Sequence, residues 1–234
     1  MTMKDDNNIS CSKCVHKKTS IFKNCPSNDL DTFFSEKKQI TFSRNKIIIK
    51  QGEVFNGIVC IKEGIAKVFQ TKKNKEDFIF WFAKPGDLLG VDSFINKDVY
   101  SYSVMAVEST KICLISKNDI DTIVKKKPEI SIEMIKLLCE RIDYIEKRMV
   151  SIAQKGIKEQ LAEVLLLLSH KSGNQTNSLT ISYSIKDLAN IIGTTKNYIY
   201  KLLSEFSQNK IVSIENRTLK INDVKKLSKI SLGN

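Results

Sequence analysis

The stretch from Tyr183 to Val212 constrains the fold most, because it predicts two short helices joined by a tight turn. The first helical pattern stops at Gly193, where the missing side chain permits the turn that a second, crossing helix needs. Thr194 or Thr195 can cap the second helix at its N-terminus. The apolar positions of that helix predict one buried face, made by Ile199, Leu202, Leu203 and Phe206. The pattern is typical of a helix-turn-helix.

A β-hairpin is predicted directly after these helices, which an ordinary helical hairpin in a small core does not require. Residues 211–214 and 218–221 are rich in apolar and β-branched residues, and a short polar turn separates them. We therefore expect a winged helix. The groups that can reach base edges or phosphates on its second helix are Lys196, Asn197, Tyr200 and Lys201. Phosphate contacts are expected from Thr194, Thr195 and Arg217.

The charge distribution supports double-stranded DNA as the partner. The 234 residues carry a net charge of +12, and the part from Ala153 onward has twelve Lys and Arg against six Asp and Glu. Basic charge is therefore densest around the winged helix, as binding to a polyanion requires. The first ten residues are polar and acidic, and no apolar run approaches the length of a membrane span. We expect a cytoplasmic protein with no membrane partner.

The first half of the chain has a different pattern, with short segments rich in β-branched and aromatic residues between turn residues. These segments are residues 46–50, 58–62, 66–70, 78–82, 102–107 and 111–116. After an N-terminal cysteine-containing segment at residues 1–20, the pattern predicts an antiparallel β-roll of about eight strands at residues 21–127.

A long helix is predicted at residues 128–153, with Pro128 marking its start. The winged-helix domain would then occupy residues 154–234. The heptad seam of the long helix consists of Ile135, Leu138, Ile142, Ile145, Met149 and Ile152. The helix could instead pack on its own roll, but the charged residues between these positions leave a stripe suited to one partner helix. A parallel homodimer would present two recognition helices to a palindromic operator. The predicted fold class is α+β.

In this layout the chain resembles the Crp/Fnr family of bacterial transcription regulators over nearly its whole length. The resemblance rests on residues 50–53 (KQGE), 61–64 (IKEG), 85–90 (PGDLLG), 187–189 (DLA) and 193–196 (GTTK). It implies a homodimeric transcription regulator that contacts RNA polymerase through loops on the roll. The charged run from Lys72 to Asp77 is a candidate for that contact, although a solvated turn explains it equally well.

Cyclic nucleotide binding, which the roll of some family members performs, is not expected here. In those members, according to the resemblance, a Glu binds the ribose and an Arg binds the phosphate. At the corresponding positions this chain has Val91 and a residue near Ser101. No arginine occurs between Arg44 and Arg141, so the bidentate partner of a phosphate is missing from the roll.

The cysteines instead resemble the ligands of the oxygen-sensing Fnr branch, in which three N-terminal thiolates and one from the last roll strand hold a 4Fe-4S cluster. The resemblance implies Cys11, Cys14, Cys25 and Cys113 as ligands. Cys25 departs from the family pattern, because ten residues separate it from Cys14. Zinc binding with His16 as a substitute ligand, a thiol-disulfide switch, and cysteines without a cofactor stay open.

The remaining candidate residues favour packing. We expect Cys60 to be a small core residue and Cys139 to pack beside the heptad seam. Haem is disfavoured because the two histidines are His16 and His170, of which the second is a poor axial ligand. No phosphate-binding glycine loop, nucleophile elbow or catalytic triad is evident, so we expect no enzyme. Two alternatives remain: the same regulator without a cofactor, controlled by a small molecule in the roll or by abundance, and a scaffold that does not bind DNA.

Overall fold

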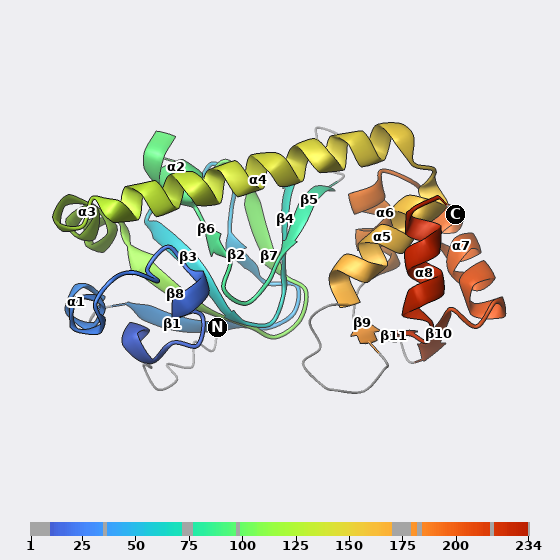
Figure 1. Cartoon of the computed structure of the whole chain (residues 1–234), viewed down its shortest axis with the longest axis horizontal. Helices are drawn as coiled ribbons and strands as arrows, with labels where there is room; N and C mark the ends of the chain where they lie inside the picture. The colour runs from blue at the N-terminus through green and yellow to red at the C-terminus, as the bar shows by residue number, and fades with distance from the viewer. Residues whose placement is uncertain are drawn as a thin grey trace. The chain divides into compact units, whose positions relative to one another are not determined.

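The computed structural model describes residues 10–34, 37–71, 77–96, 99–169, 179–181, 184–215 and 218–233 (Figure 1). The chain divides into two compact units. The first contains the described residues up to Gln70 together with Trp81–Tyr144, and the second contains the described residues of Thr71–Phe80 and of Ile145–Asn234.

Two four-stranded antiparallel sheets form the roll. One has the strand order β1-β8-β3-β6 and the other has the order β2-β7-β4-β5. The strands are β1 (Lys38–Phe42), β2 (Ile47–Ile49), β3 (Gly57–Glu63), β4 (Ala66–Thr71), β5 (Asp77–Ala83), β6 (Leu88–Leu89), β7 (Ser103–Ala106) and β8 (Thr110–Ser116). Because side chains alternate along a strand, apolar residues such as Ile61, Val68, Val104 and Ile112 build the buried core.

Short helices cover the ends of the roll. The N-terminal segment contains the 3₁₀ turns η1 (Cys11–Lys13) and η2 (Lys17–Thr19) and the helix α1 (Ser27–Phe33). The helix α2 (Val91–Asn96) follows β6, and α3 (Lys117–Lys126) follows β8. The Ser116 hydroxyl accepts a hydrogen bond from the Asp119 amide and so caps α3. On α3, Ile120 and Ile123 are fully buried, and this helix packs on β3.

The long helix α4 extends from Glu129 to Gln154. Ile130 and Met134, near its start, are buried. Further along the helix, the apolar side chains of the predicted seam are largely exposed, so one face of α4 is left uncovered.

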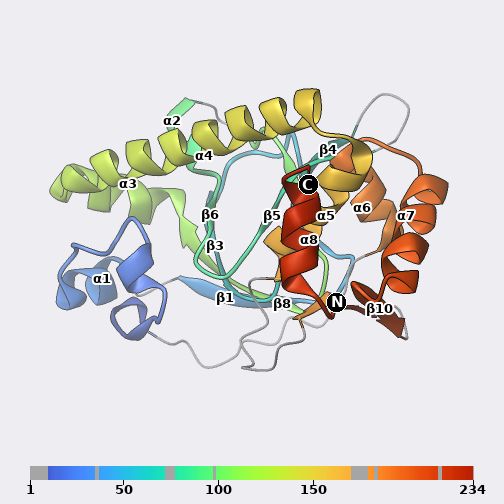
Figure 2. The same cartoon turned by 45° about the vertical axis from the view of Figure 1, so that its right-hand side comes forward.

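The second unit combines helices, seen together in Figure 2, with a small three-stranded sheet, which Figure 1 shows at one end of them. Its helices are α5 (Ile157–Ser169), α6 (Ile185–Ile192), α7 (Lys196–Gln208) and α8 (Val224–Ser231), and its strands are β9 (Leu179–Ile181), β10 (Val212–Glu215) and β11 (Thr218–Ile221). Leu161, Leu203, Phe206 and Leu227 are buried here. Burial of each such side chain stabilises a fold by about 1.5–3 kcal/mol.

The predicted fold is confirmed: a roll, a long helix and a winged helix-turn-helix follow one another along the chain. All six predicted strand segments of the roll overlap observed strands. The sequence pattern did not indicate β1, β6, α2, α3, β9 or α8 individually. The predicted domain boundaries stay a prediction.

Candidate DNA interface and sensor site

Helices α6 and α7 are connected by the tight turn that the sequence predicts. The Ser184 hydroxyl accepts a hydrogen bond from the Asp187 amide at the start of α6, and it donates to the Asp187 carboxylate. Gly193 ends α6 with a φ of +80° in the left-handed region, and its amide donates to the Ala189 carbonyl over 2.8 Å. The Thr195 hydroxyl then accepts from the Tyr198 amide and caps α7.

Helix α7 buries one face and exposes the other at its N-terminal end. The predicted inward residues Ile199, Leu202, Leu203 and Phe206 are all buried. The predicted base-reading and phosphate-binding residues Lys196, Asn197, Tyr200 and Lys201 are all exposed. Tyr198 is also exposed in the first turn of α7 and was missed by the sequence analysis. Since it lies between Asn197 and the inward Ile199, the helical period alone did not assign it to either face.

The other predicted DNA contacts are positioned by the turn and the wing. Thr195 is exposed and Thr194 is partly exposed, directly before the first amides of α7. Free amides at a helix N-terminus favour a phosphate there. The wing pairs β10 with β11, and Val212 lies opposite Ile221. Arg217 lies outside the described residues, so its predicted role is not examined by the structure.

An uninterrupted apolar stripe covers one face of α4. Of the six predicted seam residues, five are among the exposed large hydrophobic side chains: Ile135, Ile142, Ile145, Met149 and Ile152, with exposed fractions of 43–65%. The sixth, Leu138, is partly exposed. Cys139, which we expected to pack beside the seam, is exposed. Monomeric soluble proteins rarely expose a continuous apolar stripe of this kind.

The turns η1 and η2 make polar contacts with α1 and with strand β3 of the roll. Asp31 on α1 accepts hydrogen bonds from the hydroxyls of Ser10 and Ser12, and these hydrogen bonds are the main cause of its lowered pKa. The His16 ring nitrogen Nε2 lies 3.1 Å from the Lys62 carbonyl oxygen on β3. Figures 1 and 2 show the chain of these two turns beside α1, and η1 contacts that helix. The contacts bring η1 and η2 onto the outside of the roll.

Three of the four predicted cluster ligands come together at this place. Burial raises the pKa of the Cys11 thiol to about 11, and the nearby Cys113 and Cys14 also raise it, against the opposing effect of Lys37. Burial likewise raises the pKa of Cys113, and Cys14 contributes to that shift. Cys14 therefore lies near both Cys11 and Cys113, and Cys113 lies near Cys11.

Cys60, expected to be a core residue, lies at the same place. It is directly opposite Cys113 in the antiparallel pairing of β3 with β8. Burial is the main reason that its pKa lies well above the ordinary value, and Cys113, Cys14 and Cys11 add to the shift. Cys60 is only partly buried by surface area, unlike its neighbours Val59 and Ile61. The sequence could not reveal this neighbour because it does not show the strand register.

The structure does not bring Cys25 to the other three predicted ligands. Its amide donates to the Phe22 carbonyl, and the side chain is buried. Burial raises its pKa, and the charged groups that modify it most are Asp29 and Lys127. Lys127 forms an ion pair of 2.9 Å with Asp29, which joins α1 to the end of α3. Cys25 thus belongs to the packing between these helices.

No three His, Cys, Asp or Glu side chains in the described part of the chain converge closely enough to hold a single metal ion. Zinc needs its ligands about 2.0–2.3 Å from one ion, whereas each iron of a 4Fe-4S cluster takes its own thiolate. The thiolates that hold a 4Fe-4S cluster can therefore lie farther apart than the ligands of a single ion. His170, weighed as a haem ligand, lies outside the described residues.

The two positions that would recognise a cyclic nucleotide are occupied in other ways. Val91 is fully buried, and the Ser101 hydroxyl donates to the Asp92 carboxylate. Beside them, the Tyr102 hydroxyl accepts from the Gly90 amide over 2.9 Å and donates to Asp92. Gly90 and Asp92, at the end of β6 and the start of α2, are therefore hydrogen-bonded to the side chains of Ser101 and Tyr102.

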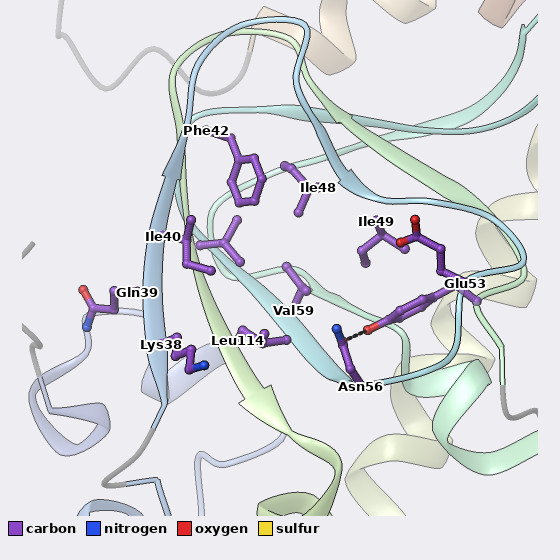
Figure 3. Close-up of a pocket in the computed structure, with 12 residues that line it drawn as sticks. Lys38, Gln39, Ile40, Phe42, Ile48, Ile49, Glu53, Asn56, Val59 and Leu114 are labelled. Carbon is purple, nitrogen blue, oxygen red and sulfur yellow. Dashed lines mark hydrogen bonds between the residues drawn. The ribbon is translucent and has the colours of Figure 1, made fainter. Parts of the chain in front are cut away.

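A cavity of about 490 Å³ lies inside the roll (Figure 3). Figure 3 shows apolar side chains such as Ile40, Phe42 and Leu114 facing this space, with Glu53 and Asn56 toward one end. There the Tyr100 hydroxyl donates to the Asn56 side-chain oxygen over 2.6 Å. The remaining lining residues are Lys38, Gln39, Ile48, Ile49, Val59 and Ile112. Its volume is in the range of small-molecule sites.

The fold, the exposed N-terminal face of α7 and the wing together define a DNA-binding transcription regulator with an attached roll. Residues 39–127 match the cyclic nucleotide-binding domain, and residues 159–230 match the Crp-like helix-turn-helix domain. The chain belongs to the Crp/Fnr family, whose members are transcription regulators and not enzymes. No helix in the described residues is long and apolar enough to cross a membrane.

Relatives with known roles include anaerobic regulators. The chain is 25% identical over 207 residues to the anaerobic regulatory protein of Pasteurella multocida, which covers 87% of this chain and 75% of the relative. It is 23% identical over 207 residues to the fumarate and nitrate reduction regulatory protein of Yersinia pestis, covering 87% and 82%. The structure of FixK2 from Bradyrhizobium japonicum aligns with a TM-score of 0.74 and 14% identity, covering 83% of this chain and 96% of that one.

Proposed function

We propose that this regulator binds a palindromic operator as a homodimer and that an iron-sulfur cluster held against the roll controls its activity. The observation that carries this proposal is the contact of His16, two residues after Cys14, with the Lys62 carbonyl on the roll, which is supported by the electrostatic influence of Cys14 and Cys113 on Cys11. The names of the Pasteurella and Yersinia relatives, which refer to anaerobic regulation and to fumarate and nitrate reduction, support it. A cluster would supply chemistry that changes with oxidants or gases.

The chain's own residues would couple that site to the roll. Cys113 is on a central strand of a sheet, whereas Cys11 and Cys14 are on a segment held by a few polar contacts, including the one between His16 and Lys62. A group bound by all three thiolates would fix this segment on the sheet. Loss of the group would remove this attachment, and the part of the segment around Cys11 and Cys14 would detach more readily.

The exposed stripe on α4 supports the homodimer. In a parallel pair of helices, each seam residue meets its counterpart, and the interface excludes water from both stripes. A dimer would also present two α7 helices to successive major grooves. Since a transcription regulator works on chromosomal DNA, the proposal places the protein in the cytoplasm. RNA polymerase is the further proposed partner, but most of the candidate contact at Lys72–Asp77 lies outside the described residues.

Analysis of iron and acid-labile sulfide tests the cluster. Protein purified without oxygen should contain about four of each per subunit and lose its visible absorption in air. Operator binding, measured before and after exposure to air, should change in the same samples. Protein that is free of iron after anaerobic purification, yet dimeric and able to bind DNA, would exclude cluster control.

The roll cavity supports a second candidate function, in which a small molecule controls the regulator. Its largely apolar walls and its polar end at Asn56 and Tyr100 suit a small amphipathic compound. Compounds of this class should raise the melting temperature of the wild type. They should have less effect on Leu114→Phe, whose larger side chain would narrow the cavity. Equal shifts in both proteins would argue against binding in the cavity.

A further inference from the structure

We propose that Cys60, and not Cys25, completes the thiolate set with Cys11, Cys14 and Cys113. This inference rests on the proposed function, because it names the fourth ligand of the same cluster. It differs from the set that the family resemblance implies, in which three ligands come from the N-terminal segment. Here two ligands would come from that segment and two from neighbouring strands of the roll.

The strand register places Cys60 and Cys113 on the same outer face. In the pairing of β3 with β8 they are direct partners, and such partners have Cα atoms about 4.5–5.5 Å apart. Their neighbours Val59, Ile112 and Leu114 line the cavity inside the roll. Because successive side chains alternate between the faces of a sheet, the two cysteines point away from that cavity.

The N-terminal segment reaches this outer face beside Cys60. Lys62, whose carbonyl oxygen lies 3.1 Å from the His16 ring, is two residues from Cys60 on the same strand. Cys14 is two residues before His16 in this segment, so the same contact brings Cys14 to the part of the face where Cys60 lies. Four thiols from three separate parts of the chain are thereby gathered on one face.

Lysine side chains around the thiols supply the opposite charge. Lys62 and Lys111 are two residues from Cys60 and Cys113 on the same strands, so the alternation of side chains places them on the same outer face. A metal centre bound by four thiolates is anionic overall, and nearby ammonium groups compensate part of that charge. A group of neutral thiols without a metal needs no such compensating charge.

Cys25 has a structural role that accounts for its burial. Phe22, whose carbonyl accepts from the Cys25 amide, packs edge-to-face on Phe34 with ring centroids 5.0 Å apart. Neither Cys11, Cys14, Cys60 nor Cys113 is among the charged groups that modify the pKa of Cys25 most. Its replacement should therefore affect packing and leave the cluster in place.

Cys25→Ser and Cys60→Ser are a matched pair that tests this assignment. After purification without oxygen, Cys25→Ser should contain the same iron and sulfide per subunit as the wild type, about four of each. Cys60→Ser and Cys113→Ser should both lose most of the iron and the visible absorption. Cys60→Ala provides a second replacement, and circular dichroism and size-exclusion chromatography establish that each variant is folded and has the wild-type oligomeric state.

The outcomes separate the two proposals. Iron-free wild-type protein would contradict the proposed cluster itself. Full iron in the wild type and in Cys60→Ser, or loss of iron from folded Cys25→Ser, would overturn the assignment of Cys60 and leave the cluster intact as a proposal.

Thiol alkylation of the wild type gives a readout that needs no variant. At an alkaline pH, Cys11, Cys14, Cys60 and Cys113 should be protected from iodoacetamide in protein that contains iron and should become reactive together after the iron is chelated. The alkaline pH is needed because burial raises the pKa of the unligated Cys11 and Cys60 thiols and the thiolate is the reactive form. Cys139, which is exposed, should react in both states. Mass spectrometry of the labelled peptides would show this, and Cys60 labelled before chelation would contradict the inference.

Discussion

The guanidinium of Arg141 on α4 lies 5.3 Å from the centroid of the Trp81 ring on β5, in a cation–π contact. The same guanidinium donates a hydrogen bond to the Leu88 carbonyl on β6. Trp81 in turn packs edge-to-face on Tyr102. The arginine thus joins the long helix α4 to β5 and β6 of the roll.

Arg141→Ala should lower the free energy of unfolding by about 2 kcal/mol, because it removes a cation–π contact and a charge-assisted hydrogen bond. Arg141→Lys should have a smaller effect, since an ammonium group can keep one contact but lacks the planar fork that makes both. Urea unfolding of the three proteins measures the difference. An alanine variant as stable as the wild type would show that this contact does not hold α4 to the roll.

Local patterns predicted the main elements of the fold because each has a short-range cause. Alternating apolar residues predict strands, and Gly193 between two amphipathic segments predicts the turn of the helix-turn-helix. The elements that were missed are short. Strand β6 has two residues, Leu88 and Leu89, and α8 has eight, of which three are lysines. Their formation depends on tertiary packing.

The candidate sensor site was predicted only in part, because it depends on strand register. Cys60 and Cys113 are 53 positions apart in the sequence, and their pairing follows from the alignment of β3 with β8. Cys25 shares a short segment with Cys11 and Cys14, but the turns between Ser20 and Pro26 direct it toward α1. The family resemblance therefore implied Cys25 although its spacing departs from the family pattern, whereas the fold brings Cys60 close.

Glu163→Gln should make stability less dependent on pH. The Glu163 carboxylate accepts from the Ser151 hydroxyl over 2.7 Å and from the Lys155 ammonium over 2.9 Å. Burial raises its pKa, but these partners outweigh burial and leave the pKa below the ordinary value. Its stabilising contribution is complete above the unfolded-state pKa of about 4.3 and is lost as the pH falls through the lower folded-state pKa.

Urea unfolding of Glu163→Gln at pH 7 should show a loss of about 1 kcal/mol, and this loss should decline toward zero near pH 3. Glu146→Gln, at an exposed position of the same α4–α5 region, is the control and should change stability little at either pH. A constant loss at all pH values would mean that the carboxylate charge is not responsible.

Gly193→Ala should destabilise the winged helix through backbone strain alone. The φ of +80° is unfavourable for a residue with a Cβ atom, at a cost of about 1–2 kcal/mol. A Cβ atom at this position would meet no heavy atom within 4 Å, so no steric clash is added. Gly193→Asn should cost less, because Asn tolerates the left-handed region. Calorimetry should show the highest melting temperature for the wild type, a lower one for Gly193→Asn and the lowest for Gly193→Ala. Equal melting temperatures for the wild type and Gly193→Ala would refute the strain.

Ile142→Glu should dissociate the proposed dimer. Ile142 is 54% exposed in the centre of the α4 stripe, and a pair of buried carboxylates in a seam would be strongly unfavourable. Lys147→Glu, on a charged face of the same helix, is the control for the effect of changed charge. Sedimentation equilibrium should show a dimer for the control and a monomer for Ile142→Glu. Dimers of equal stability would place the interface elsewhere.

Lys196→Ala and Lys201→Ala should weaken operator binding mainly by removing phosphate contacts. The plot of log K against log salt has a negative slope. For each lysine that contacts a phosphate in both subunits, its replacement should make this slope less steep by about 2. Asn197→Ala should act differently, because an Asn that reads an adenine edge contributes about 1–3 kcal/mol of discrimination at one base pair. Its loss should relax specificity at that position of each half-site and leave the salt slope unchanged.

A selected operator sequence and titrations at several salt concentrations separate these effects, with Lys125→Ala on α3 as the control for a lost lysine. Lys125 is exposed on the roll side of the chain and should leave both the slope and the specificity unaltered. Because Lys196, Asn197 and Lys201 share the exposed face of α7, a uniform loss of affinity in all three variants would mean that this face positions the protein without reading the sequence. Unchanged binding in all three would show that another surface contacts the DNA.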